Sequence, residues 1–406
     1  MRILFVIDLA YPDHAGGSHR LCYEVARRLA QRGHEVHLIT GQASDDSATP
    51  GTERIDGVYY HRLSRDKRNF VTHALSYILG ARRVFDQLAR EAPFDVISGH
   101  YVLPTLGILL SHRKQSTPVV STFYPWAGEF GIELQRGSQD LSTLARWRRA
   151  AWIAPTLALV RKLERLTLAR SARLQTLSQY LAEIAVGDYG IDRSKITVIP
   201  AGVDTARFTP TMDRIAVRQQ LGLPPDRPLL LTVRRLYARM GLENLVQAMH
   251  AVIRRQPRAL LLIGGQGPLR GRLQTLVEQS ELVENVRLLG YVEDKRLPMY
   301  YQAADLFILP TLDLEGFGLV TLEALACGTP VLGTPVGGTV EILRGLDPRL
   351  LFVSSRPEDM AKGIIEYLSA PAVSSEQCRR YVLEHYPWDK TAMELETLFR
   401  LVADGV

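Results

Sequence analysis

Short apolar runs that alternate with amphipathic stretches most constrain what this 406-residue chain can fold into. The first half opens with a predicted buried strand at Arg2–Leu9 and a helix at Ser18–Arg32, whose apolar residues share one face. Strands that alternate with helices form parallel sheets covered on both faces by helices. Further strands are expected at Glu35–Thr40, Val58–Leu63, Val96–Ser98, Pro118–Phe123, Arg173–Leu177 and Lys195–Ile199, with a long helix from about Val71 to Glu91.

The same pattern restarts near residue 210. The predicted strands of this second series are Leu229–Val233, Ala259–Ile263, Val286–Leu289, Leu306–Leu309 and Pro330–Leu332, with helices from Leu242 and Leu269 and at Leu297–Ala304 and Leu319–Cys327. We therefore predict an α/β protein of two doubly wound, Rossmann-like domains, residues 1–208 and 209–387, that face one another across a cleft. Ligands of such sheets bind beyond the carboxyl ends of the strands, so the cleft is the expected active site.

The net charge of +6 is concentrated in one segment. Residues 141–175 contain eight arginine and lysine residues against one glutamate, so the rest of the chain has a formal charge of −1. The segment also contains Trp147 and Trp152, and two interpretations are open. It forms a helix on an anionic lipid surface, or a solvated helix face whose apolar side lies in the core and which Pro155 interrupts. Because no nucleic-acid-reading module accompanies the basic segment, no nucleic-acid partner is expected.

The cysteines and the apolar stretches indicate the compartment. Cys22, Cys327 and Cys378 lie far apart without metal-ligand spacing, which is typical of free thiols in a reducing compartment. Asp8 interrupts the first apolar run, so a secretion signal is not expected. No uncharged apolar stretch approaches the about 20 residues that a membrane span needs. We expect a cytoplasmic protein, peripheral at the inner face of the membrane if residues 141–175 bind lipid.

The stretch from Glu315 to Glu323, Glu-Gly-Phe-Gly-Leu-Val-Thr-Leu-Glu, carries the most information about function. It follows a predicted strand, and its glycines free the backbone around Phe317–Leu319 at a helix start, which favours an anion-binding nest. The two carboxylates are too far apart to share a proton. We expect each to accept a separate hydroxyl group, as in a sugar and a ribose.

Three further groups lie at strand ends. Arg234-Arg235-Leu236 follows the strand Leu229–Val233, where an arginine can grip a diphosphate with two hydrogen bonds. Gly16-Gly17 precedes the first helix, where backbone N–H groups favour phosphate binding, although turn geometry alone also explains paired glycines. Gly264-Gly265-Gln266-Gly267 does not continue as a dinucleotide fingerprint, because the third glycine of that motif would fall on Arg270.

Together these motifs resemble the retaining glycosyltransferases of family 4, which have the GT-B fold and use nucleotide-sugar donors. Glu315 and Glu323 match the E-x7-E element of that family, Arg235-Leu236 its GRL-x-x-x-KG element, and Gly16-Gly17 its glycine-rich first loop. The resemblance runs from Met1 to about Trp388. It also implies a C-terminal helix, within residues 388–406, that packs back on the first domain.

The resemblance implies roles for individual residues. The catalytic residues that it implies are Arg235, Glu315 and His100. The donor-binding residues that it implies are Gly16, Gly17, Arg239, Tyr291, Phe317, Gly318, Leu319 and Glu323. In these roles Glu315 holds hydroxyls of the donor sugar, Glu323 binds the ribose, and Arg235 holds the diphosphate. No metal and no cofactor are expected, since the UDP- or GDP-sugar is a substrate.

Two positions depart from the family pattern. Met240 stands where a lysine is expected before Gly241, with Arg239 beside it, and Tyr124 stands where a histidine is expected. Because Glu315 and Glu323 are kept, we expect an active enzyme with a shifted substrate preference.

The predicted activity is metal-independent transfer of a hexose-type sugar, with retention, from a nucleoside-diphosphate donor to an acceptor hydroxyl. The acceptor classes that remain open are a glycan, a lipid-linked molecule and a small molecule. Two alternatives also remain open: a phosphorylase of the same fold that releases a sugar 1-phosphate, and a non-catalytic protein that binds sugar nucleotides.

Overall fold

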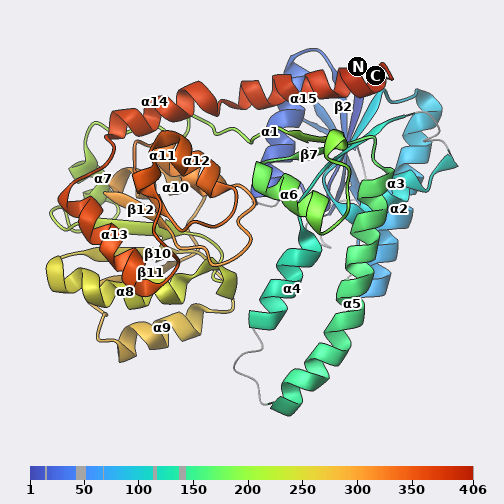
Figure 1. Cartoon of the computed structure of the whole chain (residues 1–406). Helices are drawn as coiled ribbons and strands as arrows, with labels where there is room; N and C mark the ends of the chain where they lie inside the picture. Colours follow the sequence, from blue (N-terminus) through green and yellow to red (C-terminus); the bar gives the residue numbers. More distant parts are fainter. Residues whose placement is uncertain (14–15, 43–51, 67, 113–116, 137–142, 406) are drawn as a thin grey trace. The chain divides into compact units, whose positions relative to one another are not determined.

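The computed structural model describes residues 1–13, 16–42, 52–66, 68–112, 117–136 and 143–405, which form two compact units (Figure 1). Unit 1 contains residues Met1–Ala127, Ala150–Ala201 and Trp388–Val406, and unit 2 contains Gly128–Arg149 and Gly202–Pro387. Each unit has one sheet with helices packed against it, so the predicted pair of doubly wound α/β domains is confirmed.

The sheet of unit 1 has eight strands in the order β3-β4-β2-β1-β5-β6-β7-β8. Their bounds are β1 (Arg2–Val6), β2 (Glu35–Gly41), β3 (Thr52–Ile55), β4 (Val58–Leu63), β5 (Val96–Gly99), β6 (Val119–Thr122), β7 (Arg173–Thr176) and β8 (Ile196–Val198). All neighbours pair in parallel except β3 and β4, which form an antiparallel edge. The sequence did not predict β3, because its side chains are mostly exposed and show no apolar alternation.

Helices cover both faces of this sheet, as the two-residue period of β1 requires. Leu4 and Val6 point into the core that α2 and α3 cover. Phe5 points to the other face, where its ring centroid lies 6.2 Å from that of Phe399 in α15. The helices of unit 1, with α4 and α5 running in part through unit 2, are α1 (Gly17–Gln31), α2 (Phe70–Glu91), α3 (Val102–Leu109), α4 (Trp126–Arg136), α5 (Thr143–Arg170), α6 (Gln179–Gly187) and α15 (Trp388–Ala403), with a short 3-10 turn η2 (Arg193–Lys195).

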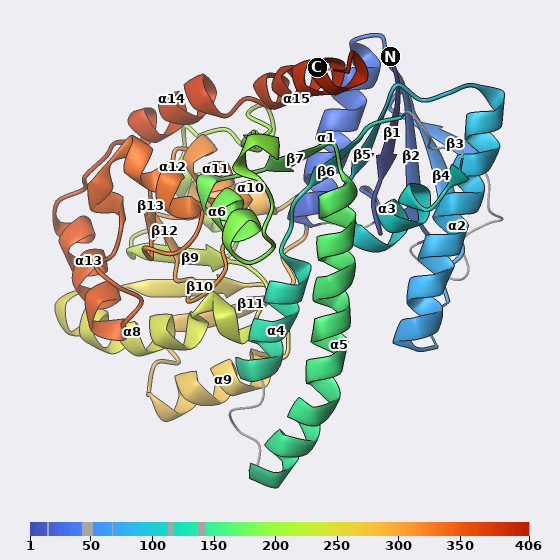
Figure 2. The same cartoon turned by 45° about the vertical axis from the view of Figure 1, so that its right-hand side comes forward.

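The C-terminal helix α15 belongs to unit 1, although the residues before it belong to unit 2. It lies against α1, as both views of the chain show (Figures 1 and 2). Arg28 of α1 binds the Asp389 carboxylate at 2.9 Å, and Arg32 binds that of Glu396 at 2.6 Å. The Thr391 hydroxyl donates to the backbone carbonyl of Pro200 at 2.9 Å. This bond joins the first turns of α15 to the segment that directly follows β8.

Two predicted boundaries differ from the structure. Residues 202–208, expected in the first domain, lie in unit 2, because the Val203 N–H donates to the Tyr386 carbonyl at 2.9 Å and Val203 bridges to Pro387. Residues 128–149 also lie in unit 2, so the sequence between β6 and β7 does not belong to one domain throughout.

Helix α5 corrects the prediction that Pro155 interrupts the basic segment. The helix runs from Thr143 through Pro155 to Arg170. A proline inside a helix removes one backbone hydrogen bond. The helix nevertheless continues for several turns on each side of Pro155. Residues 141 and 142, at the start of the basic segment 141–175, lie outside the described residues, as do the side chains of residues 143–153. In the part of the chain that is described, no helix is long and apolar enough to cross a membrane.

Unit 2 has a five-stranded parallel sheet in the order β11-β10-β9-β12-β13. The strands are β9 (Leu229–Val233), β10 (Leu260–Gly264), β11 (Val286–Gly290), β12 (Leu306–Leu309) and β13 (Val331–Gly333). Helices α8 and α9 lie on one face and α10 and α11 on the other (Figure 2). The helices and 3-10 turns are α7 (Arg214–Gln220), η3 (Ala238–Met240), α8 (Leu242–Arg255), α9 (Arg270–Gln279), α10 (Leu297–Ala303), α11 (Leu319–Ala326), α12 (Thr339–Leu346), η4 (Pro348–Leu350), α13 (Pro357–Ser369) and α14 (Ser375–His385).

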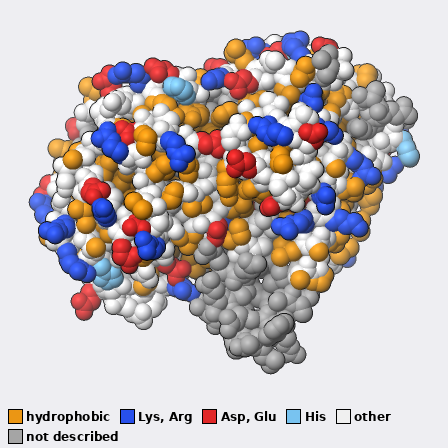
Figure 3. All heavy atoms as spheres, viewed as in Figure 1, with side chains coloured by type: hydrophobic (Ala, Val, Ile, Leu, Met, Phe, Trp, Pro, Cys, Tyr) orange, Lys and Arg blue, Asp and Glu red, His pale blue; other side chains and the backbone are white. Residues whose placement is uncertain are grey.

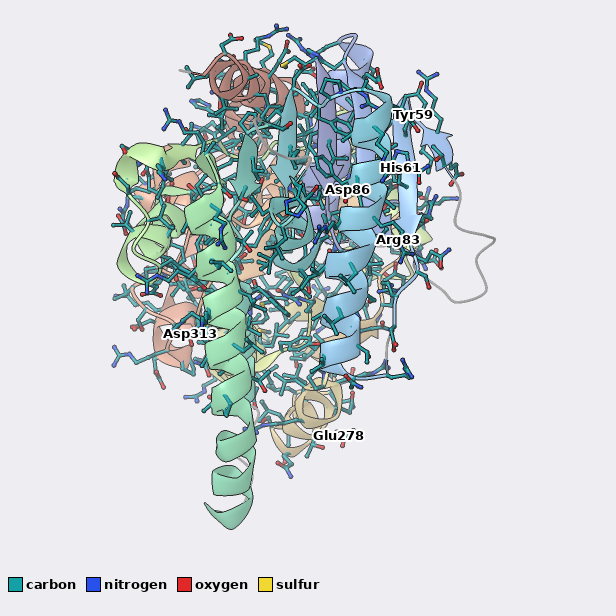
Figure 4. The ribbon with its side chains drawn as sticks, turned by 90° about the vertical axis from the view of Figure 1, so that its right-hand side faces the viewer. Tyr59, His61, Arg83, Asp86, Glu278 and Asp313 are labelled. Atoms are coloured by element: carbon teal, nitrogen blue, oxygen red, sulfur yellow. The ribbon has the colours of Figure 1, made fainter. Side chains whose placement is uncertain are left out.

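Two buried histidines, His37 on β2 and His61 on β4, lie side by side near the edge of the unit 1 sheet. Figure 4 labels His61 and Tyr59, which both belong to β4. His37 Nδ1 lies 3.0 Å from His61 Nε2, and the rings stack with centroids 5.2 Å apart. Burial lowers the pKa of His61 to about 4 and also lowers the pKa of His37. Both imidazoles are therefore neutral in the folded protein near neutral pH.

The His37–His61 pair predicts that the free energy of unfolding decreases in acid. The unfolded chain binds protons at its histidines near pH 6.5, whereas folded His61 binds one only near pH 4. The free energy of unfolding should therefore fall by about 2 kcal/mol as the pH is lowered from 6.5 through 4, and the loss from this residue should be complete about one pH unit below its folded pKa. His61→Gln should flatten the decline in a urea-unfolding series across this range. His385→Gln, at an exposed histidine, should leave it unchanged; equal slopes for wild type and His61→Gln would contradict the prediction.

Candidate active site at the carboxyl edges of the sheets

The loop after β12 is held by the turn that precedes α12. Gly318, the N-cap of α11, has φ +92°, which favours glycine. A Cβ on Gly337 would lie 2.1 Å from the Glu315 carbonyl oxygen, so glycine is required for this close backbone contact. The Thr339 hydroxyl donates to the Phe317 carbonyl at 3.0 Å. The backbone that carries Glu315 is therefore fixed by tertiary contacts, as is that of Phe317 and Gly318, whose backbone groups the family resemblance implies as donor contacts.

The Glu315 side chain is paired with Arg234. Arg234 Nη2 donates to Glu315 Oε2 at 2.7 Å, and Nη1 donates to the Thr311 hydroxyl at 2.8 Å. Thr311 in turn donates to the same Glu315 oxygen at 3.1 Å. The side chains of Arg234 and Glu315 are only 6% and 15% exposed. Burial lowers the pKa of Arg234, and the neighbouring Glu315 carboxylate opposes that shift.

The sequence singled out Arg235 and missed the role of its neighbour. The Arg235 side chain is 60% exposed, and its Nη2 lies 3.4 Å from Glu129 Oε2. Arg234 is the residue that meets Glu315, since successive side chains at the end of a strand point to opposite faces. One signal was visible in the sequence, because Arg234 occupies the position of the glycine in GRL-x-x-x-KG.

Arg239 is buried and already engaged, with its side chain 4% exposed. Its Nη1 donates to the Leu314 carbonyl at 2.7 Å, and its Nη2 lies 3.1 Å from Glu129 Oε1. Met240 is also buried. Arg239 thus supports the loop that carries Glu315, and it can meet a ligand only by exchanging these partners.

Glu323 lies on α11, which begins at Leu319. The buried Tyr301 hydroxyl donates to Glu323 Oε2 at 2.8 Å, a partner that sequence reasoning missed. Burial raises the pKa of Tyr301 well above its ordinary value, and the Glu323 carboxylate adds to that shift, so the phenol stays a donor. Tyr291 directly follows β11 and is 61% exposed. Both residues follow strands at the carboxyl edge of the unit 2 sheet, and their contacts with a ribose and a base stay predictions.

Close backbone contacts require glycine at two positions in the turn after β10. Gly265 has φ +134°, and a Cβ there would lie 1.8 Å from the Arg234 carbonyl oxygen. A Cβ on Gly267, with φ +157°, would lie 2.4 Å from the Leu236 carbonyl oxygen. The turn therefore presses directly on the backbone of Arg234–Leu236 and holds it in place.

The predicted residues of unit 1 lie at the carboxyl edge of its own sheet. Gly16 is the N-cap of α1, with an extended backbone and no side chain of its own to cap the helix. His100 follows β5 and stacks on Phe5 with ring centroids 5.6 Å apart, and burial lowers its pKa to about 3, so the imidazole is neutral. The Tyr124 ring lies 6.4 Å from the His100 ring, so the structure brings these two residues together.

Two family models together match almost the whole chain. The model described as Glycosyltransferase Family 4 matches residues 15–207, and the model described as Glycosyl transferases group 1 matches residues 213–384. A D-inositol 3-phosphate glycosyltransferase from Nocardiopsis dassonvillei is 30% identical over 414 aligned residues, which cover 97% of this chain and 91% of that protein.

Solved structures share the fold. A sucrose-phosphate synthase from Thermosynechococcus elongatus has a TM-score of 0.78 and 24% identity, with all of both chains covered. Anabaena HepE, solved in complex with UDP-glucose, has a TM-score of 0.71 and 18% identity, with 98% of this chain and 99% of that chain covered. At this level of identity the likeness shows the fold alone, which is GT-B.

A substitution at Gly241, between η3 and α8, would test how closely the backbone segments of the site pack against one another. Its φ is +71°, and a Cβ would lie 1.8 Å from the Pro310 carbonyl oxygen at the end of β12. Gly241→Ala should therefore destabilise the protein by about 2 kcal/mol or more and lower the midpoint of thermal unfolding by several degrees.

Gly271→Ala is the matched control. Gly271 lies in α9, and nothing lies within 4 Å of a Cβ there. This change should stabilise the protein by about 0.5–1 kcal/mol, because alanine is the better helix former. A Gly241→Ala protein as stable as wild type would show that the contact with Pro310 is not tight.

Proposed function

Because the chain belongs to glycosyltransferase family 4, we propose that it transfers a hexose-type sugar from a nucleoside-diphosphate donor, a UDP- or GDP-sugar, to an acceptor hydroxyl. One observation carries the proposal: Glu315, Glu323 and the guanidinium groups of Arg234, Arg235 and Arg239 gather at the carboxyl edge of one parallel sheet. Carboxylates suit the hydroxyls of sugar and ribose, and the exposed guanidinium of Arg235 suits a diphosphate.

In the proposed mechanism Arg235 binds the diphosphate, because its side chain is exposed and its contact with Glu129 is long, at 3.4 Å. Negative charge develops on the departing diphosphate, and a preorganised cation lowers that barrier. The N-terminus of α11 at Gly318 adds partial positive charge, and a contribution from the N-terminus of α1 at Gly17, in the other unit, stays a prediction. We propose that the reaction needs no metal ion.

Retention of the anomeric configuration follows from the family and belongs to the proposal. We propose front-face attack of the acceptor hydroxyl, in which the leaving phosphate accepts the proton of the acceptor. His100 is buried and neutral, and its role beside the reacting sugar stays a prediction, as does the cleft between the two domains.

The proposal is tested by incubating the protein with a panel of UDP- and GDP-sugars and measuring free nucleotide. Inositol 3-phosphate belongs among the acceptors, because several relatives are named after it. Arg235→Ala and Glu315→Gln should each lower turnover by about 100-fold or more. Because Glu315→Gln removes one partner of a buried ion pair, the thermal unfolding midpoint of each variant is measured beside its turnover. Arg258→Gln, at an exposed arginine paired with Asp226 in the same unit, should turn over like wild type.

Other outcomes separate the alternatives. Release of sugar 1-phosphate from a disaccharide and inorganic phosphate would favour a phosphorylase. Nucleotide-dependent thermal stabilisation without turnover would favour a non-catalytic binding protein, as buried Met240 at the lysine position motivates. Near-normal turnover by Arg235→Ala would remove Arg235 from the mechanism.

We also propose contact between α5 and an anionic membrane surface. On the described part of this helix, Leu159 and Leu166 are exposed beside the exposed cations Arg161, Lys162 and Arg165. By contrast, basic and acidic side chains are interspersed on the face of unit 2 that Figure 3 shows. A local cationic and apolar surface fits the headgroup region of anionic lipids.

Vesicle co-sedimentation tests this contact. The wild type should sediment with vesicles that contain phosphatidylglycerol but not with phosphatidylcholine alone. Changing Arg161, Lys162 and Arg165 to glutamate should abolish binding, because each phosphate-facing cation contributes about 1 kcal/mol. The same charge change on exposed residues of unit 2, Arg254, Lys362 and Arg380, should not. Binding that never occurs, or that survives the first set, would leave α5 as a solvated helix.

A further inference from the structure

Arg234 has no role in the proposed mechanism, yet it is the buried cation that pairs directly with Glu315, and its side chain is only 6% exposed. Both of its terminal nitrogens are engaged, Nη2 with Glu315 Oε2 at 2.7 Å and Nη1 with the Thr311 hydroxyl at 2.8 Å. Its Nε is buried and has no hydrogen-bond partner among the described residues. Two of the five N–H donors of this guanidinium are therefore committed to Glu315 and Thr311, and the side chain is only 6% exposed, so it is less accessible to a diphosphate than the 60% exposed side chain of Arg235.

The two donors act on the same oxygen of Glu315. Arg234 Nη2 and the Thr311 hydroxyl both point at Oε2, at 2.7 and 3.1 Å. In the part of the chain that the structure describes, no hydrogen bond to Glu315 Oε1 is present. A carboxylate has acceptor capacity on both oxygens, so Oε1 keeps its full capacity for a ligand hydroxyl.

The backbone that carries Arg234 and Glu315 is held in place by hydrogen bonds and close packing. The Arg234 N–H donates to the Gly264 carbonyl at 3.0 Å, and the Gly265 backbone packs against the Arg234 carbonyl so closely that no Cβ fits. Thr311 is fully buried, and the Glu315 carbonyl accepts from the Gly338 N–H at 2.8 Å. Both ends of the ion pair are thus held by their own backbone.

We propose that Arg234 is a positioning residue for donor-sugar recognition: with Thr311 it fixes Glu315 Oε2, so that Oε1 accepts a hydrogen bond from a hydroxyl of the donor sugar. The inference rests on the proposed function and deepens it. It separates the two neighbouring arginines, with Arg234 acting on the sugar through Glu315 and Arg235 acting on the diphosphate. Arg234 also gives Glu315 a cationic partner at a position where the family motif has glycine.

The test compares binding of the nucleoside diphosphate with binding of the sugar nucleotide. Calorimetric titrations use UDP, UDP-glucose, GDP and GDP-mannose, with kcat and KM measured for the donor that turns over. Arg234→Gln should leave the Kd for the diphosphate within about twofold, weaken the sugar nucleotide about 10-fold or more, and lower kcat about 100-fold.

Arg234→Lys should restore part of the lost sugar affinity, because an ammonium can still pair with Glu315 Oε2. Thr311→Val should weaken the sugar nucleotide by a smaller factor, and exposed Arg258→Gln should match wild type. If Arg234→Gln does not fold, Arg234→Lys and Thr311→Val still discriminate, since both keep a group of similar volume.

Equal weakening of diphosphate and sugar nucleotide by Arg234→Gln would overturn the inference and make Arg234 a diphosphate ligand. Unchanged binding and turnover with a lower unfolding midpoint would overturn it in favour of a purely structural pair. A wild type that binds none of the four probes would instead contradict the proposed function, and the inference would fall with it.

Discussion

The central strands of both sheets are buried on both faces, which leaves few places there for polar groups. Leu229, Leu230 and Leu231 of β9 are fully buried, as are Ile3, Leu4 and Phe5 of β1. Parallel strands end at one edge, so the loops that follow them bring distant segments together there. Arg234 after β9 and Glu315 after β12 meet for this reason, although 81 residues separate them. The candidate site is a consequence of how the sheets are covered.

Burying a charged pair at this edge is costly, and the structure compensates for that cost locally. The Arg234 guanidinium gains a carboxylate and a hydroxyl, and Glu315 gains two donors on one oxygen. Breaking a buried ion pair by removing one partner costs about 3–5 kcal/mol, so the arrangement persists once it is formed. Nearby glycines also help to hold the segments that carry this ion pair. Gly241 and Gly265 allow backbone segments to approach one another more closely than any Cβ permits.

Elements with a strong period were predictable, and elements without one were not. The apolar strands β1 and β9 and the amphipathic helix α1 lie where the sequence places them, within a residue or a few. Strand β3 was missed, because it is exposed and is defined only by its pairing with β4. The break at Pro155 was wrong, because local propensity did not decide the course of α5. The boundary at residue 208 was late, because the backbone contact of Val203 with Tyr386 is not visible in sequence.

By itself the sequence determined the α/β class, the two series of strands and helices, and the position of Glu315 and Glu323 around a helix start. It could do so because burial on two faces and the 3.6-residue period leave local patterns in the chain. Only the tertiary structure decided that Arg234 rather than Arg235 meets Glu315, that Arg239 is engaged by Leu314 and Glu129, and that Tyr301 holds Glu323. These pairings join residues far apart in sequence, and the direction of each side chain is set by the strand end, 3-10 turn or helix that carries it.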